Sequence, residues 1–272
     1  MFCLFAGLAL ADKLACQLYI DPSQHRYTAH LPFLLDQVIK KSPNGLSRTV
    51  TCLREPQTQL GRMIRKIGIS RWCDFVEPSF RFSPDFFSAS KGSCAIGYFQ
   101  SWRYLEPVGI ERLDEVRKAI KHLAMNPVSF RPRDIVIHVR RGDYLRSGVR
   151  EIHGILPYRY YSKAITALRA AGQSGEVWAV SEDRLGDLGE LENEIGTSVT
   201  QVGATSLWND LQTLITSPSL VIANSTFSWM AGWLNQGKTP VIAPKPWFFT
   251  NDYDTSDLIP THWSMVEYKV RD

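Results

Sequence analysis

The sequence lacks both a long apolar run and paired cysteines, and each absence excludes a class of protein. No apolar stretch reaches the roughly 20 residues that a membrane-spanning helix needs. The cysteines, odd in number and without a Cys-x-x-Cys pair, are Cys3, Cys16, Cys52, Cys73 and Cys94. Such a set argues against a disulfide framework or a zinc site, and favours free thiols in a reducing compartment.

The sequence also lacks a large excess of charge of one sign. The 31 lysines and arginines oppose 27 aspartates and glutamates, which leaves a formal net charge of +4. This mild excess suits an anionic small ligand and is far from the dense basic stripe of a nucleic-acid-binding protein. The chain contains neither G-x-G-x-x-G nor G-x-x-x-x-G-K-[ST], so we expect neither a dinucleotide site nor an NTPase P-loop.

The first residues, MFCLFAGLALADK, admit two interpretations. The triplet Ala9-Leu10-Ala11 resembles a signal-peptide cleavage site, but no lysine or arginine precedes the apolar run. A buried first helix over residues 2–15 is therefore the favoured prediction, with a signal peptide as the alternative.

In the second half of the chain, apolar β-rich runs alternate with helical patterns. The predicted strands are residues 134–139, 176–180, 198–202, 220–223 and 240–243, and the predicted helices are residues 157–171, 185–195, 207–215 and 226–236. Ser206 caps the third of these helices and Pro218 stops it. Such alternation implies right-handed βαβ units, and hence an α/β domain with a doubly wound parallel sheet.

The first half is less regular. Strands are expected at residues 17–21, 49–53 and 95–99, a helix at residues 31–41, and a Pro/Ser/Phe-rich loop at residues 77–92. A later amphipathic helix carries Leu113, Val116, Ile120 and Leu123 on one face. It leads into residues 126–133, whose two prolines and lack of periodicity predict a linker between two domains.

Polar residues follow three of the predicted strands, where ligands bind in an open parallel sheet. Arg140, Arg141 and Asp143 follow the first strand. Glu182 and Asp183 follow the second, and the run Asn224-Ser225-Thr226 opens a helix after the fourth. Helix-start N–H groups and arginine forks suit phosphate, whereas carboxylates suit ribose hydroxyls or guanine. The sequence therefore predicts a nucleoside diphosphate site.

Two strings carry a resemblance to a known family. His138-Val139-Arg140-Arg141-Gly142-Asp143-Tyr144, followed by Ala223-Asn224-Ser225-Thr226-Phe227-Ser228-Trp229, resembles the α-1,2-fucosyltransferases, which transfer fucose from GDP-fucose to galactosides. Weaker similarities are Gly97-Tyr98-Phe99-Gln100, His153-Gly154 before Tyr160-Tyr161, and Trp208-Asn209-Asp210-Leu211. The resemblance extends over nearly the whole chain.

The resemblance implies a GT-B-type architecture of two Rossmann-like domains. Residues 1–126 would form the acceptor-side domain, and residues 127–272 the GDP-fucose domain with a C-terminal tail. The implied reaction is inverting and needs no metal or other cofactor, since GDP-fucose is the donor substrate. The acceptor would be a galactose-terminated glycan, lipopolysaccharide or oligosaccharide, and no nucleic acid is expected. A bacterial enzyme would be cytoplasmic, with peripheral association at the inner membrane face; a eukaryotic one would lie in the Golgi membrane.

Three departures from the family pattern stand out. The family carries a first strand and a G-L-G-N-Q turn before its Met-Phe pair, so we expect the first strand of the N-terminal domain to be missing. Glu182 stands where the family has aspartate, and Met230 where it has tryptophan. An inactive sugar-nucleotide or glycan-binding protein, or a fucosyltransferase of another linkage, are the alternatives.

The resemblance and the sheet edge together name the site residues. Arg140, Asp143 and His153 are the predicted catalytic residues; Asp143 is the favoured base, with Glu151 and His153 as alternatives. Substrate binding is predicted for His138, Arg140, Arg141, Glu182, Asp183, Asp210, Asn224, Ser225, Thr226, Phe227 and Ser228. His138 and Phe227 are equally open to a core role, and Trp229 is expected in the core. The pair Asp252 and Asp254 resembles a metal-binding D-x-D, which is not favoured in this polar tail.

Overall fold

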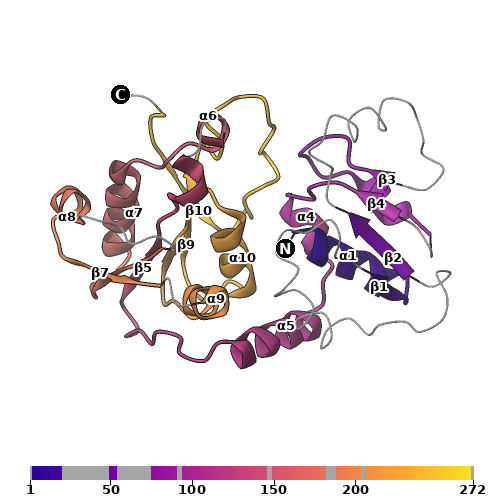
Figure 1. The fold of residues 1–272 in the computed structure, drawn as a ribbon, viewed down its shortest axis with the longest axis horizontal. Helices are drawn as coiled ribbons and strands as arrows, with labels where there is room; N and C mark the ends of the chain where they lie inside the picture. The colour runs from indigo at the N-terminus through magenta and orange to yellow at the C-terminus, as the bar shows by residue number, and fades with distance from the viewer. Residues whose placement is uncertain are drawn as a thin grey trace. The chain divides into compact units, whose positions relative to one another are not determined.

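The computed structural model describes residues 2–19, 49–53, 75–90, 94–145, 149–181, 188–203 and 206–270. The chain divides into two compact units, drawn in Figure 1. Unit 1 comprises Met1–Ala119 with Asp254–Ile259, and unit 2 comprises Ile120–Tyr253 with Pro260–Asp272. The helix predicted at residues 31–41 lies outside the described residues. The assignment of acceptor and donor roles to residues 1–126 and 127–272 stays a prediction.

Unit 1 contains a parallel sheet and the apolar first helix. Its elements are α1 (Phe2–Lys13), β1 (Gln17–Tyr19), β2 (Thr49–Leu53), β3 (Phe75–Val76), the 3-10 helix η4 (Pro84–Ser88), β4 (Cys94–Ile96) and α4 (Trp102–Leu105). The strands are parallel in the order β1-β2-β4-β3. Almost all of α1 is buried, and it contacts β1 and β2. The predicted buried first helix is therefore confirmed.

The loop predicted at residues 77–92 contributes to the core of unit 1. Phe86 lies within 5.1 Å of both Phe99 and Tyr104, measured between ring centroids, and is fully buried. The C-terminal segment returns to this unit, because Asp257 accepts hydrogen bonds from the backbone N–H groups of Phe82 and Trp102. Aromatic contacts made across the chain thus organise a segment that has no periodic pattern of its own.

Helix α5 (Ile110–Leu123) confirms the predicted amphipathic pattern, since Leu113, Val116 and Ile120 are buried. Residues 126–133 contain no helix or strand. No helix among the described stretches is both long and apolar enough to cross a membrane.

Unit 2 is built around a six-stranded sheet in which every pairing is parallel. Its strands are β5 (Ile135–His138), β6 (Val177–Val180), β7 (Val199–Val202), β8 (Leu220–Val221), β9 (Val241–Lys245) and β10 (Ser264–Glu267). Its helices are η5 (Gly142–Leu145), α6 (Val149–His153), α7 (Tyr158–Ala170), α8 (Gly189–Ile195), α9 (Leu207–Ile215) and α10 (Thr226–Leu234). The predicted α/β class with a parallel sheet is confirmed.

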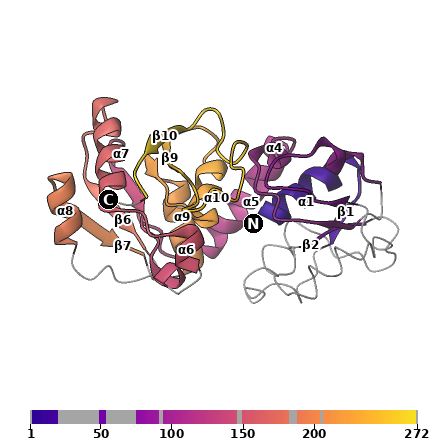
Figure 2. The same cartoon turned by 90° about the horizontal axis from the view of Figure 1, so that it is seen from above.

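The strand order is β10-β9-β8-β5-β6-β7, which is the Rossmann order. The direction of winding reverses between β5 and β8, and a ligand of such a sheet binds beyond the carboxyl ends of the strands at that point. Strand β10 was not predicted, because it is an edge strand whose residues are mostly exposed and carry no apolar run. Figure 2 shows the same ribbon turned by 90°, with β6, β7, β9 and β10 of this sheet labelled.

Helices α7 and α8 pack together, as do α9 and α10. One core, shared with α7 and α8, contains Ile135, Ile137 and Val139. The intervening residues of β5, Val136 and His138, therefore face the opposite side of the sheet. The Ser206 hydroxyl accepts a hydrogen bond from the Asn209 N–H at 3.1 Å, as expected for a helix cap. Helix α10 ends at Leu234, before the predicted Gln236, because Gln236 has a left-handed φ of 60°.

Candidate active site

Strand β5 delivers two arginines to the carboxyl edge of the sheet in unit 2. The strand is completely buried, whereas Arg140 and Arg141 are half-buried just beyond it. The Arg140 guanidinium carbon lies 5.5 Å from the Tyr144 ring centroid, and that of Arg141 lies 4.8 Å from the Tyr158 centroid. A cation–π contact draws the guanidinium charge to the face of the ring and is compatible with N–H contacts to an anion. Both arginines are therefore suited to bind an anion while a tyrosine ring holds each guanidinium in place.

His138, the last residue of β5, is buried within this edge at 1% exposure. Its backbone carbonyl accepts a 3.1 Å hydrogen bond from the Tyr161 hydroxyl, and its ring lies 5.7 Å from Phe227. Its Nδ1 has no hydrogen-bond partner among the described residues. Burial, and then the charge of Arg140, lower the pKa of His138 to about 3. The imidazole is therefore neutral near pH 7, with one donor and one acceptor nitrogen.

The start of α10 faces the same edge from the far side of the switch point. Ser225 caps the helix, since its hydroxyl accepts from the Phe227 N–H at 3.3 Å. The hydroxyl of Ser228 points back to the carbonyls of Ala223 and Ser225, at 3.4 Å each. Thr226 is exposed at the first helical position. The first-turn N–H groups thus provide the positive end of a helix dipole at this edge.

Asn224 joins three loops through its side-chain amide. Its Nδ2 donates to the carbonyl of His153 at the end of α6, and to the carbonyl of Trp247 after β9 at 3.2 Å. The side chain is 2% exposed. These contacts support a structural role for the Asn224 amide, and its predicted contact with a nucleotide stays a prediction.

Tyr144 occupies the centre of this arrangement and was not among the predicted site residues. Its hydroxyl donates to the Asn224 carbonyl at 2.9 Å, and its ring stacks on His153 with centroids 4.9 Å apart. His153 also contacts Phe248, at 5.3 Å between centroids. The adjacency of Tyr144 to the Arg-Arg-Gly-Asp string was a signal in the sequence, but nothing local indicated a partner beyond β8.

Gly154, next to His153, has to be glycine for two reasons. Its φ of +63° lies in the left-handed region, and an added Cβ would lie 2.3 Å from the Phe249 ring. The Phe249 N–H in turn donates to the Ile152 carbonyl at 2.8 Å. This close approach of the two segments holds α6 and the His153 ring in place.

The remaining predicted residues are less well defined. Glu182 and Asp183 lie outside the described residues, as does the side chain of Asp143, whose backbone belongs to η5. Glu151 is exposed on α6, and Asp210 is buried in the first turn of α9. Trp229 is fully buried, which confirms its predicted core position.

The metal-binding interpretation of residues 252–254 gains no support from local contacts. Asp254 accepts a hydrogen bond from the Ser256 N–H at 3.0 Å, and this bond is the main cause that lowers its carboxyl pKa. No group of three or more potential metal ligands is found among the residues that the structure describes.

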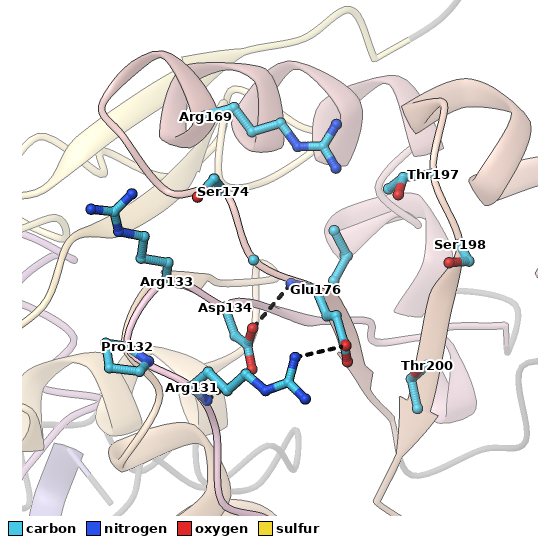
Figure 3. Close-up of a pocket in the computed structure, with 12 residues that line it drawn as sticks. Arg131, Pro132, Arg133, Asp134, Arg169, Ser174, Glu176, Thr197, Ser198 and Thr200 are labelled. Carbon is cyan, nitrogen blue, oxygen red and sulfur yellow. Dashed lines mark hydrogen bonds and ion pairs between the residues drawn. The ribbon is translucent and has the colours of Figure 1, made fainter.

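A cavity of about 690 Å³ opens at the opposite, amino edge of the same sheet (Figure 3). It is lined by Arg131, Pro132, Arg133, Asp134, Arg169, Ser174, Gly175, Glu176, Val177, Thr197, Ser198 and Thr200. None of the predicted site residues is among them. The cavity thus indicates the amino edge as the ligand site, whereas the chemistry of the switch point indicates the carboxyl edge. We favour the switch point because its side chains converge from four segments of the chain.

Comparison with known proteins identifies the family. The sequence profile described as glycosyl transferase family 11 matches residues 63–266. The chain is 27% identical over 281 residues to an alpha-1,2-colitosyltransferase of Escherichia coli, covering 98% of this chain and 94% of that protein. It is 29% identical over 123 residues to the O-antigen biosynthesis glycosyltransferase WbnK of Escherichia coli, covering 43% of this chain and 39% of that protein. The protein described here is therefore a glycosyltransferase that belongs to glycosyl transferase family 11.

Proposed function

We propose that this chain transfers L-fucose from GDP-β-L-fucose to the 2-hydroxyl of a terminal galactoside, with inversion and without a metal. The observation that carries the proposal is the convergence at the β5–β8 switch point. There Arg140, the buried neutral His138 and the start of α10 belong to one connected set of contacts.

The proposed reaction requires stabilisation of the departing diphosphate. Arg140 supplies a planar fork suited to two phosphate oxygens, and the first turn of α10 supplies N–H groups and a dipole. Donors held in place before the reaction are often the largest contribution to catalysis, because they need no reorganisation as charge develops. This arrangement supports a diphosphate leaving group without calling on a metal ion.

The acceptor hydroxyl has to lose a proton during transfer. The transition state should resemble an oxocarbenium ion, so a weak base suffices. Asp143 remains the favoured base, with Glu151 and His153 as alternatives. Near-normal transfer by Asp143→Asn, with unchanged GDP affinity, would move the assignment to Glu151 or His153.

A second candidate donor sugar is favoured by the relative that covers 98% of this chain, whose name specifies colitose. Colitose is fucose without its 3-hydroxyl. A site that hydrogen-bonds this hydroxyl discriminates strongly against the sugar that lacks it, by about 10⁴-fold where buried groups are left unpaired. Rates with GDP-fucose and GDP-colitose, measured side by side, therefore distinguish the two donors.

The acceptor is proposed by the same reasoning. One relative is named for O-antigen biosynthesis, which supports a galactose-terminated oligosaccharide or lipopolysaccharide glycan as acceptor. Such an acceptor would place the protein peripherally at the inner membrane face. GDP binding without GDP release against any acceptor panel would instead support an inactive binding protein.

Calorimetric titration with GDP and GDP-fucose tests the donor site first. We expect binding on the order of micromolar for the parent chain, and a loss of at least about a hundredfold in Arg140→Ala, because two charge-assisted hydrogen bonds are removed. The matched control is Arg131→Ala, which removes an exposed arginine at the amino edge. Equal affinities in parent and Arg140→Ala would contradict the donor site, as would a comparable loss in Arg131→Ala.

A further inference from the structure

We propose that Tyr144 is a positioning residue, which sets both the Arg140 guanidinium and the turn that begins α10. The inference rests on the proposed function, because it assigns these two groups to the diphosphate. Tyr144 lies three residues after Arg141 and is 9% exposed.

The Tyr144 hydroxyl reaches the turn that precedes α10. It donates to the Asn224 carbonyl at 2.9 Å, across 80 positions of sequence and in a buried setting. Asn224 immediately precedes the Ser225 cap, so a fixed Asn224 carbonyl constrains the peptide from which α10 starts. The direction of the first-turn N–H groups therefore depends on this one hydrogen bond, together with the contacts of the Asn224 amide.

The Tyr144 ring makes two further contacts. The Arg140 guanidinium carbon lies 5.5 Å from its centroid, and the His153 ring stacks on it with an interplanar angle of 27°. An arginine on an aromatic ring has fewer accessible side-chain conformations, so less entropy is lost when it binds phosphate. Tyr144 thus connects Arg140, Asn224 and His153, which lie on three different segments of the chain.

A purely structural tyrosine provides the matched control. Tyr160 is fully buried, and its hydroxyl donates to the carbonyl of Ile222 at 2.7 Å, at the end of the same strand β8. Its ring contacts Tyr161 and Tyr268, which lie in the core on the α7 side. Tyr160→Phe therefore removes a comparable buried hydroxyl without altering the support of Arg140.

The test compares Tyr144→Phe, Tyr144→Leu and Tyr160→Phe in the full chain. Affinities for GDP and for inorganic pyrophosphate, kcat and KM for GDP-fucose, and the urea midpoint are measured for each. For Tyr144→Phe we expect about tenfold lower kcat/KM, the size of one lost hydrogen bond. For Tyr144→Leu, which also loses the ring, we expect about a hundredfold lower kcat/KM and weaker pyrophosphate binding.

The control decides between positioning and stability. Tyr160→Phe should lower the urea midpoint as much as Tyr144→Phe does. It should nevertheless keep kcat/KM within about twofold of the parent, which is well below the change expected from the loss of one hydrogen bond at the site. The inference is overturned if Tyr160→Phe loses as much activity as Tyr144→Phe, or if both Tyr144 variants match the parent.

Pyrophosphate affinity separates this inference from the fucosyl proposal. A parent chain that binds GDP and pyrophosphate but transfers no fucose refutes only the fucosyl proposal, and Tyr144→Leu is then judged by its affinities. A parent that binds neither compound overturns both.

Discussion

At the amino edge of the sheet in unit 2, the buried Asp134 carboxylate accepts hydrogen bonds from the N–H groups of Arg131 and Glu176 and from Trp178 Nε1, at 2.9, 3.0 and 3.2 Å. At the carboxyl edge, the equally buried His138 leaves its Nδ1 without a hydrogen-bond partner among the described residues. Arg140 and Arg141 lie there over tyrosine rings. One edge uses its buried polar group to join β5 to its neighbour, whereas the other carries the polar groups of the proposed donor site.

The comparison shows how a structural polar cluster can be distinguished from a functional one. The amino edge carries a cavity of about 690 Å³, and its Arg131 forms a 3.3 Å ion pair with Glu176. Both side chains of that pair are exposed, so the pair contributes little to stability. The presence of this cavity would favour the amino edge, whereas hydrogen-bond satisfaction and the strand order favour the carboxyl edge.

The largest expected effect is on stability and concerns the amino edge. Asp134→Ala leaves the Glu176 N–H and Trp178 Nε1 without their acceptor, so we expect the free energy of unfolding to fall by about 3 kcal/mol. Urea unfolding measures this loss. The folded variant should bind GDP with the affinity of the parent. A weaker affinity would mean that the amino edge also contributes to ligand binding.

A smaller loss is expected at the carboxyl edge. Gly154→Ala introduces backbone strain at a positive φ and a clash with the Phe249 ring. It should therefore lower the free energy of unfolding by about 2 kcal/mol. Gly196→Ala is the control, because Gly196 has a similar φ of +68° with open space around it, so only the backbone strain of about 1 kcal/mol applies. If both variants lose the same amount in urea unfolding, Phe249 does not hold this loop. Transfer activity should fall only in Gly154→Ala, since the displaced segment carries His153.

The smallest effect, taken over a single pH unit, is a pH dependence of stability that originates in His138. Its folded pKa of about 3 lies below the unfolded value of about 6.5, so below that pH the unfolded chain takes up a proton that the folded chain does not. Stability due to the neutral imidazole is complete above pH 6.5, and falls by about 1.4 kcal/mol for each unit as pH decreases toward 3. Urea unfolding of the parent should show this extra slope relative to His138→Gln. Equal slopes would mean that His138 titrates normally, and that the carboxyl edge is wetter than its burial indicates.

Much of unit 2 could be predicted because its signals are local. Strands β5, β6, β7 and β9 coincide with apolar runs, and the Ser206 cap marks the start of α9. Elements that are short or carry no apolar pattern were missed, namely β3, η4, α4, η5, α6 and β10. In unit 1 the aromatic cluster around Phe86 and Tyr104 depends on contacts between distant segments, which periodicity does not reveal.

The sequence by itself determined the class of the C-terminal fold, the loops that carry polar residues, and the strings that indicate the family. These properties are set by residue type and short spacing, and need no knowledge of which strands are neighbours. Only the tertiary structure decided that β8 lies beside β5, and therefore that Tyr144 meets Asn224 from 80 positions away. It also decided that the Asn224 amide holds loops together and that His138 stays neutral. Such outcomes depend on burial and on strand order, which are properties of the folded chain as a whole.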